Sequence, residues 1–331
     1  MKKTVSFSKN STNVFFHILT KCNLKCRHCY INPEHHGKET LSISVIDAWL
    51  KEFAGKSSES NVIFLGGEPT LHPDLPLAVK KARKMGYNSI TIDTNGYLFH
   101  DFIEKVLPED LDYISFSLDG ATKETNDMIR GSGSFDICTS GIRKAISKGF
   151  NTSLIYTVSS LNIHELEMMV PFVKKLGINR LFIQVLGIRG KSVESQNDMM
   201  QVSRERWASV VPSVAEKIAD SGIIVSYPKV FLDIDEQFEC AGVVADNYFI
   251  FPNGRVYRCP LCEDFSIHSM AFENNKIVLT EKINENDFFQ LQIPEGCVMN
   301  KIIQPDNLTY TSNGSPEYKI ACCLLKEEIS N

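Results

Sequence analysis

The chain has 331 residues, of which 43% are hydrophobic and 23% are charged, an ordinary composition that excludes a disordered or fibrous protein. Its formal net charge of −5 argues against broad binding to a nucleic-acid backbone, which requires a basic surplus. The sequence shows no apolar run of the roughly 20 residues that a membrane helix needs, and no signal peptide. We therefore expect a cytoplasmic protein, in which ten cysteines favour metal or redox chemistry over disulfides.

Short apolar runs alternate with amphipathic segments along the first two thirds of the chain. The runs predict strands at 13–19, 61–65, 89–93, 112–118, 153–158 and 180–186. The intervening segments predict helices at 44–53, at 74–86, from about 98, up to 149, at 162–177 and from about 203. Strands separated by helices pair in parallel through right-handed crossovers. Six such units predict an α/β fold, either an open doubly wound sheet or a partial (β/α)6 barrel, with the loops after the strands gathered at one edge.

Three cysteines lie within eight residues, directly after the first predicted strand. They are Cys22, Cys26 and Cys29, and the charged and polar residues between them argue against a buried core loop. A structural zinc site would need a fourth ligand, from His28, His35 or His36. An iron–sulfur cluster held by three thiolates would leave one iron open for a ligand. The spacing by itself favours the cluster only modestly.

Two further motifs follow predicted strands and reach the same edge of the sheet. GGEP occupies residues 66–69 and SLDG occupies residues 117–120. Together with C-x3-C-x2-C after the first strand, they resemble the radical S-adenosylmethionine (SAM) superfamily over residues 12–225. The resemblance implies that the three cysteines hold a [4Fe–4S] cluster whose open iron chelates SAM. It also implies reductive cleavage of SAM to a 5′-deoxyadenosyl radical, removal of a hydrogen atom from a substrate, and a flavodoxin- or ferredoxin-type electron donor.

The same resemblance implies a SAM pocket along this edge. Glu68, with the backbone of Gly66 and Gly67, would receive the SAM ammonium, and a carboxylate beside a cation forms a charge-assisted pair. The other implied pocket residues are His28 and Tyr30 near the adenine, Ser117 and Asp119 at the ribose or amino-acid moiety, Arg130 at the carboxylate, and Thr94, Asn95 and Gln184 along the edge. The alternative is that several of these are turn or cap residues and that Gln184 only ends its strand.

After about residue 225 the alternation stops, and six of the ten cysteines follow. The pattern C-x13-G-x4-C from Cys240 to Cys259 resembles the start of the SPASM and Twitch domains, which carry auxiliary iron–sulfur clusters. This resemblance implies one auxiliary [4Fe–4S] cluster, and a structural zinc is its rival. The candidate ligands are Cys240, Cys259, Cys262, Cys297 and Cys322, with Cys323 as an alternate. The expected division is a tail at 1–11, a barrel at 12–228 and an auxiliary domain at 229–331.

The sequence therefore predicts a radical SAM enzyme that oxidises, or forms a bond on, a peptide or small molecule. One alternative is a radical SAM epimerase in which Cys322 or Cys323 returns a hydrogen atom. Another is a non-catalytic iron–sulfur or zinc protein, and a nucleic-acid-modifying enzyme is disfavoured by the acidic balance. Cys138, on the apolar face of a predicted helix, is expected in the core. The segment 281–287 is expected to be a solvated acidic stretch.

Overall fold

The computed structural model describes residues 1–194, 200–304 and 307–330. Within these ranges the chain forms a 13-stranded sheet in the order β1-β15-β8-β7-β6-β5-β4-β3-β2-β10-β11-β12-β13, and a small sheet of β14 and β9. The strands are β1 (Lys2–Val5), β2 (Ser11–His17), β3 (Glu59–Leu65), β4 (Ser89–Thr94), β5 (Tyr113–Ser117), β6 (Thr152–Val158), β7 (Arg180–Val185), β8 (Ile224–Pro228), β9 (Phe231–Leu232), β10 (Asp246–Ile250), β11 (Arg255–Tyr257), β12 (Met270–Glu273), β13 (Lys276–Leu279), β14 (Lys319–Ile320) and β15 (Lys326–Ile329).

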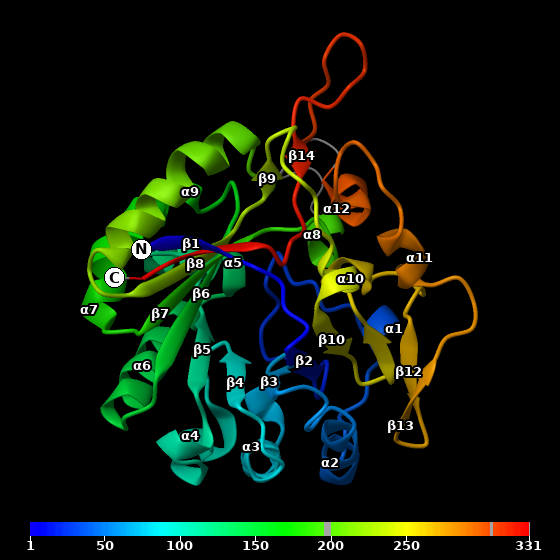
Figure 1. Cartoon of the computed structure of the whole chain (residues 1–331). Helices are drawn as coiled ribbons and strands as arrows, with labels where there is room; N and C mark the ends of the chain where they lie inside the picture. The colour runs from blue at the N-terminus through cyan, green and yellow to red at the C-terminus, as the bar shows by residue number, and fades with distance from the viewer. Residues whose placement is uncertain (195–199, 305–306, 331) are drawn as a thin grey trace.

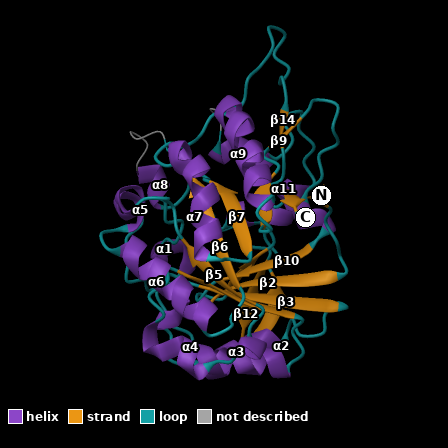
Figure 2. Ribbon diagram, turned by 90° about the vertical axis from the view of Figure 1, so that its left-hand side faces the viewer, coloured by secondary structure: helices purple, strands orange, loops and turns teal. Residues whose placement is uncertain are grey.

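Helices cover the outer face of the parallel strands, and shorter helices accompany the C-terminal segment (Figures 1 and 2). The helices are α1 (Pro33–His36), α2 (Ile43–Lys51), α3 (Leu75–Lys84), α4 (Phe102–Lys105), α5 (Lys123–Arg130), α6 (Ser134–Ser147), α7 (Met169–Leu176), α8 (Lys191–Glu194), α9 (Arg204–Ala219), α10 (Ala241–Val244), α11 (Glu285–Phe289) and α12 (Val298–Ile303). The helix expected from about residue 98 is reduced to a 3-10 turn and the four residues of α4.

The parallel part of the sheet confirms the predicted strand–helix alternation. Strands β2 to β8 lie side by side in chain order, and each pair of neighbours is parallel. Alternate positions, such as Val14 and Phe16 in β2 and Ile90 and Ile92 in β4, are fully buried, because they pack under the helices. The positions between them face the interior of the curved sheet. The fold is therefore the expected α/β partial barrel, with β8 as a seventh parallel strand that the sequence did not indicate.

The barrel stays open because the C-terminal segment extends both edges of its sheet. Strand β10 pairs in parallel with β2, and β11 to β13 follow antiparallel. At the other edge β15 inserts antiparallel between β8 and β1. The expected N-terminal tail at 1–11 therefore contains a paired edge strand, and Figure 1 shows both chain ends beside β8. Residues on either side of position 228 thus share one continuous sheet.

The helix ends agree with the local sequence signals. The Ser203 hydroxyl caps α9 by accepting from the Arg206 amide at 3.4 Å. Gly177 ends α7 with φ of +77°, a conformation that favours glycine. Asp74 occupies the predicted cap position of α3, although its side chain accepts no capping hydrogen bond.

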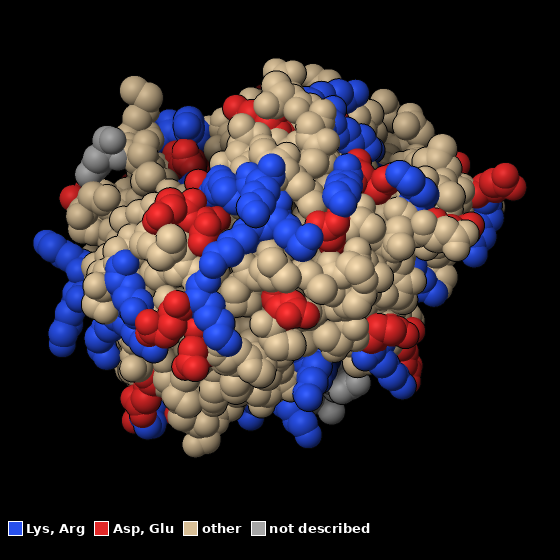
Figure 3. Space-filling model, turned by 90° about the horizontal axis from the view of Figure 1, so that it is seen from below, with Lys and Arg blue, Asp and Glu red and all other residues tan. Residues whose placement is uncertain are grey.

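On the face shown in Figure 3, Lys and Arg side chains lie next to Asp and Glu side chains. Several of these charges form ion pairs; Lys51 and Lys81, for example, both contact Asp47, at 2.6 and 2.8 Å. No helix in the described ranges is long and apolar enough to cross a bilayer.

Candidate active site

A cavity of about 370 Å³ lies at the carboxyl edge of the parallel strands. It is lined by all but one of the residues that the sequence assigned to the first cluster and the SAM pocket, namely Cys22, Cys26, His28, Cys29, Tyr30, Gly66, Gly67, Glu68, Thr94, Asn95, Ser117, Arg130 and Gln184. Gln184 is an exposed residue of β7, and it belongs to the lining of the cavity. Asp119 is the exception.

The three-cysteine loop follows β2 and is fastened to the end of α5. The Arg27 amide donates to the Ile129 carbonyl at 3.0 Å, and the Cys26 thiol lies 3.8 Å from the Arg130 carbonyl. The three cysteines are free and half-buried. Burial raises the pKa of Cys22 to about 11 and also raises that of Cys26. A bound metal centre would have to stabilise these thiolates, because the protein surroundings favour the thiols.

The GGEP turn packs directly against this loop. The Gly67 amide donates to the Leu19 carbonyl and the Glu68 amide to the Lys21 carbonyl, both at 3.0 Å. A Cβ atom on Gly67 would lie 2.4 Å from the carbonyl oxygens of Thr20 and Lys21. Only glycine therefore permits this approach of two backbone segments.

The Glu68 carboxylate is buried and satisfied by the chain itself. It accepts from the Thr70 amide at 3.0 Å and hydroxyl at 2.6 Å, from the Thr94 hydroxyl at 2.8 Å, and from the Asn95 amide at 2.7 Å. Burial raises the pKa of Glu68, and these hydrogen bonds oppose that effect. The carboxylate thus joins the loops that follow β3 and β4. Thr94 supports the pocket through Glu68, while the Asn95 side chain donates to Asn23 in the cysteine loop at 2.8 Å.

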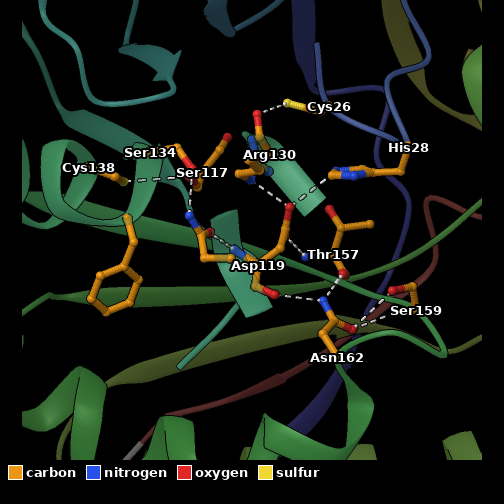
Figure 4. A network of polar contacts seen from close by, with 12 residues as sticks. Cys26, His28, Ser117, Asp119, Arg130, Ser134, Cys138, Thr157, Ser159 and Asn162 are labelled. Carbon is orange, nitrogen blue, oxygen red and sulfur yellow. Dashed lines mark hydrogen bonds and ion pairs between the residues drawn. The ribbon is translucent and has the colours of Figure 1, made fainter. Parts of the chain in front are cut away.

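Asp119 does not line the cavity; Figure 4 shows it at the centre of a network of polar contacts with Arg130 and His28. It is fully buried and contacts Arg130 Nε at 2.6 Å and His28 Nε2 at 3.2 Å, and it accepts from the Thr157 amide at 2.7 Å. The sequence placed Asp119 at the SAM ribose or amino-acid moiety. In the structure the Asp119 carboxylate contacts Arg130 and His28, which both line the cavity. Its role is therefore to orient these two side chains. Burial lowers the pKa of His28 and Asp119 opposes this effect.

Tyr30 is held by residues that the sequence did not single out. Its hydroxyl lies 2.7 Å from His17 Nε2, and the Arg189 guanidinium lies over its ring at 4.5 Å. Arg189 also forms an ion pair of 2.7 Å with buried Glu263. His17, Arg189 and Glu263 all line the cavity. They stand in no motif, and their proximity depends on contacts between distant segments.

A second, smaller cavity lies among the C-terminal cysteines. Its lining contains Cys240, Cys259, Cys297, Cys322 and Cys323. The remaining candidate, Cys262, is fully buried in an apolar cluster with Phe251 and Tyr257 and is absent from that lining. Cys323 lines both this cavity and the larger one. Cys138 is buried in the main core, as expected.

The acidic segment 281–287 is mostly exposed, as expected, but one of its residues, Glu285, is buried. Glu285 is fully buried and accepts from the amides of Arg258 and Cys259 at 2.7 and 3.1 Å. It also accepts from the Ser269 hydroxyl at 2.7 Å. Its carboxylate thereby fixes the chain on which Cys259 stands. The local sequence contains an Asn-x-x-Asp capping pattern at Asn284. This pattern indicates the start of α11 but does not indicate that Glu285 is buried.

Comparison with known proteins relates this chain to one superfamily. Residues 17–173 match the model of the Radical SAM superfamily. This chain carries a radical SAM domain. It is 30% identical over 236 residues to Fe-coproporphyrin III synthase of Methanosarcina barkeri, a match that covers 70% of this chain but only 57% of that protein. It is 27% identical to a probable GTP 3′,8-cyclase of Metallosphaera sedula, over 79% of this chain and 85% of that protein.

Solved radical SAM structures share the fold. Streptococcus suis SuiB bound to the precursor peptide SuiA superposes with a TM-score of 0.69 and 13% identity, over 96% of this chain and 76% of that chain. The enzyme anSMEcpe with bound AdoMet gives a TM-score of 0.63 and 17% identity, over 84% and 82%. These likenesses extend beyond the matched domain into the C-terminal segment.

A radical SAM enzyme implies a [4Fe–4S] cluster and SAM, and the residues of the larger cavity fit both. Three free thiols line this cavity, and Gly66 and Gly67 line it as well. Among the described residues, no three Cys, His, Asp or Glu side chains are arranged to hold a single metal ion.

Proposed function

We propose that this radical SAM enzyme removes a hydrogen atom from a peptide or small-molecule substrate and carries out an oxidation or bond formation on it. The observation that carries the proposal is the shared cavity of the three-cysteine loop, the GGEP turn and Arg130. The proposed cluster ligands are Cys22, Cys26 and Cys29. A cluster bound by these residues would supply the electron for the reductive cleavage of SAM.

The chain's own residues position SAM and exclude water. The proposed contacts are the Gly66–Gly67 backbone for the SAM ammonium and Arg130 for its carboxylate, since a guanidinium fits a carboxylate with two parallel hydrogen bonds. Asp119 holds Arg130 and His28 in place. Glu68 fixes the GGEP turn against the loop after β4. The fixed positions lower the reorganisation that SAM binding requires.

We further propose one auxiliary [4Fe–4S] cluster in a unit formed by residues 229–331. Its proposed ligands are Cys240, Cys259, Cys297 and Cys322, which share the smaller cavity. Cys262 is the weaker candidate because it does not line that cavity. An auxiliary cluster beside the larger cavity would accept an electron from the substrate, which an oxidation requires. The external electron donor is proposed to be a flavodoxin or ferredoxin.

The named relatives support the enzyme class and leave two substrate classes. Two relatives are named for GTP and for Fe-coproporphyrin III, both small molecules. The structures SuiB and anSMEcpe are named with bound peptides. The proposal therefore covers both classes.

Iron counting after anaerobic reconstitution tests the proposal. We expect about eight irons in the wild type and about four in a Cys22/Cys26/Cys29→Ala variant, the numbers for two four-iron clusters and for one. Dithionite-driven formation of 5′-deoxyadenosine should occur only in the wild type. The matched control is Cys138→Ala, which removes a buried thiol that lines neither cavity and should keep all the iron.

Each half of the proposal fails separately. Iron that disappears entirely from the triple variant would contradict the auxiliary cluster. Iron retained in full by the triple variant would contradict the assignment of the first three ligands. A Cys240→Ser variant should lose about four irons, whereas Cys262→Ser should lose none.

The position of Cys323 favours a second candidate function. This thiol lines both cavities, so it is placed to return a hydrogen atom to a substrate radical. The transfer forms a C–H bond on the substrate and leaves a thiyl radical on Cys323. An external reductant would then convert the thiyl radical back to the thiol. The result would be epimerisation without net oxidation. In deuterated water this reaction would place one deuterium in the product, and Cys323→Ala would abolish that label.

A further inference from the structure

The charged side chains of the larger cavity are almost all paired within the protein. The two guanidiniums each contact a buried carboxylate: Arg130 lies 2.6 Å from Asp119, and Arg189 lies 2.7 Å from Glu263. The carboxylate of Glu68 accepts four hydrogen bonds from the chain. The cavity wall thus carries little uncompensated charge from these groups.

Lys326 is the exception among the cations of the described cavity lining. Its side chain lines the cavity, and within the described ranges its ammonium has no carboxylate in ion-pair distance and no hydrogen-bond acceptor. The ammonium lies over the ring of Phe182, whose centroid is 4.5 Å from Nζ. Burial, together with the charge of Arg180, lowers the pKa of Lys326. A half-buried ammonium without an anionic partner destabilises the folded protein. An anionic ligand bound in the cavity would supply that partner.

The backbone holds Lys326 at a defined place. Strand β15 pairs on one side with β8, where Lys326 stands opposite Pro228, and on the other with β1, where it stands opposite Val5. A residue on a central strand moves less than one on a loop. The ammonium is therefore presented to the cavity by rigid backbone.

Asp93 does not neutralise Lys326. It lines the same cavity from β4, and the charges of Asp93 and Lys326 influence each other's pKa, yet the two form no ion pair. Burial raises the pKa of Asp93 to about 7, and a hydrogen bond with Ser115 opposes this rise. Near neutral pH the Asp93 carboxyl group is therefore only partly charged.

We propose that Lys326 binds an acidic group of the substrate, either a carboxylate or a phosphate, inside the barrel cavity. This proposal deepens the function proposed above and rests on it for the identity of the cavity as the substrate site. A lysine offers three donors around one point charge and accommodates either anion. The neighbouring wall from Phe182, Tyr227 and Pro228 is largely apolar, so the anion would gain its stabilisation chiefly from this ammonium.

Two small anions test the proposal without knowledge of the full substrate. Pyrophosphate and succinate are titrated calorimetrically into the reconstituted, SAM-bound enzyme under anaerobic conditions. We expect the wild type to bind at least one of them about tenfold more tightly than Lys326→Gln, which corresponds to about 1.4 kcal/mol. Lys326→Arg should retain most of the affinity. The preferred probe tells phosphate from carboxylate.

Matched controls separate this site from surface binding and from the SAM site. Lys3 is exposed and pairs with Glu328 of the same strand β15, so Lys3→Gln should bind both anions like the wild type. Lys326→Gln should keep the wild-type affinity for SAM. If Lys326→Gln does not fold, Lys326→Met takes its place in the test, because methionine retains an aliphatic stem.

Equal affinity of Lys326→Gln and the wild type for both anions, or no binding of either anion by the wild type, overturns the proposal. Loss of SAM affinity without loss of anion affinity also overturns it, because Lys326 would then serve the cofactor. Formation of 5′-deoxyadenosine is measured in parallel. Its absence from the wild type would count against the proposed function, whereas its presence together with equal anion affinities would count against Lys326 alone.

Discussion

Asp119 shows how one buried carboxylate organises a cavity that it does not itself line. Its contacts with Arg130, His28 and the Thr157 amide join the loop after β5 to α5, the cysteine loop and β6. Its own amide donates to the Asn126 side chain at 2.9 Å. The residue therefore acts on the cavity only through the groups that it orients.

Asp119→Asn should lower the free energy of unfolding by roughly 3 kcal/mol, because the substitution leaves the Arg130 charge buried without a counter-ion. Urea denaturation of the apo-protein measures this change. The control is Asp136→Asn, which removes a carboxylate paired with Lys123 where both side chains are mostly exposed; its effect should stay within about 0.5 kcal/mol. Equal effects of the two substitutions would contradict the role given to Asp119.

Asp93 should give the stability of the protein a measurable pH dependence. Its pKa is about 7 in the folded protein against the ordinary value of 3.8, so the folded state binds the proton more tightly than the unfolded state. Between about pH 4 and pH 7 the stability contribution of this group should therefore fall as pH rises. The difference in unfolding free energy between the wild type and Asp93→Asn, measured across this range, should fall in the same direction and level off above about pH 8. A flat difference would show that Asp93 has an ordinary pKa.

At the scale of elements, the decisive contact is that of the GGEP turn with the cysteine loop. Both loops follow neighbouring parallel strands, and their backbones approach within hydrogen-bonding distance at Gly67 and Glu68. Close approach of this kind leaves no room for a side chain.

Gly67→Ala should therefore destabilise the protein by about 2 kcal/mol and weaken SAM binding, because one of the two backbones must move. Calorimetric unfolding and SAM titration measure the two effects. Gly187 lies on the same cavity, and a Cβ atom there would meet Ile303 at an ordinary 3.5 Å. Gly187→Ala should be nearly neutral, and a similar loss in both variants would mean that the backbone approach is not critical.

Helix α11 stabilises the turn that carries Cys259 through Glu285. Glu285→Gln should lower the unfolding free energy by about 1 to 3 kcal/mol, because the amide group places a donor where backbone N–H groups need an acceptor. The iron content of the reconstituted protein should fall as well. Glu281→Gln, a change at an exposed position of the same segment, is the control, and it should leave both stability and iron unchanged.

For the whole molecule, the C-terminal segment is joined to the barrel by a shared sheet and by ion pairs of unequal burial. Arg189 and Glu263 form a buried pair, which the Tyr30 ring covers. Lys276 and Glu52 form a second pair between the same parts of the chain, with the lysine side chain 75% exposed.

Arg189→Met should lower the unfolding free energy by about 3 kcal/mol, because Glu263 would lose its counter-ion in a buried site. Hydrogen exchange should accelerate in residues 246–279. Lys276→Met should change stability by less than about 1 kcal/mol, since exposed ion pairs contribute little. If both substitutions have the same small effect, the C-terminal segment is held by its strand pairing alone.

The sequence by itself determined the local features of this protein. Apolar runs of strand length, helical spacing and capping residues predicted β2 to β7 and most of the helices between them, because these signals depend on neighbours a few residues apart. The spacing of Cys22, Cys26 and Cys29, with the GGEP motif, predicted the radical SAM domain. The carboxyl ends of parallel strands meet at one edge of the sheet. The order of strands and helices along the chain therefore predicted that the motif residues would line one cavity.

Only the tertiary structure decided which distant residues meet. Nothing in the residues near β15 indicates that it inserts between β8 and β1, since strand pairing depends on surfaces that form when the chain folds. The same reason applies to the cavity position of Lys326, the pair of Arg189 and Glu263, the burial of Glu285 and the contacts of Asp119 with its partners. Each of these contacts joins segments that are separated along the chain by loops and helices, and local periodicity carries no information about them.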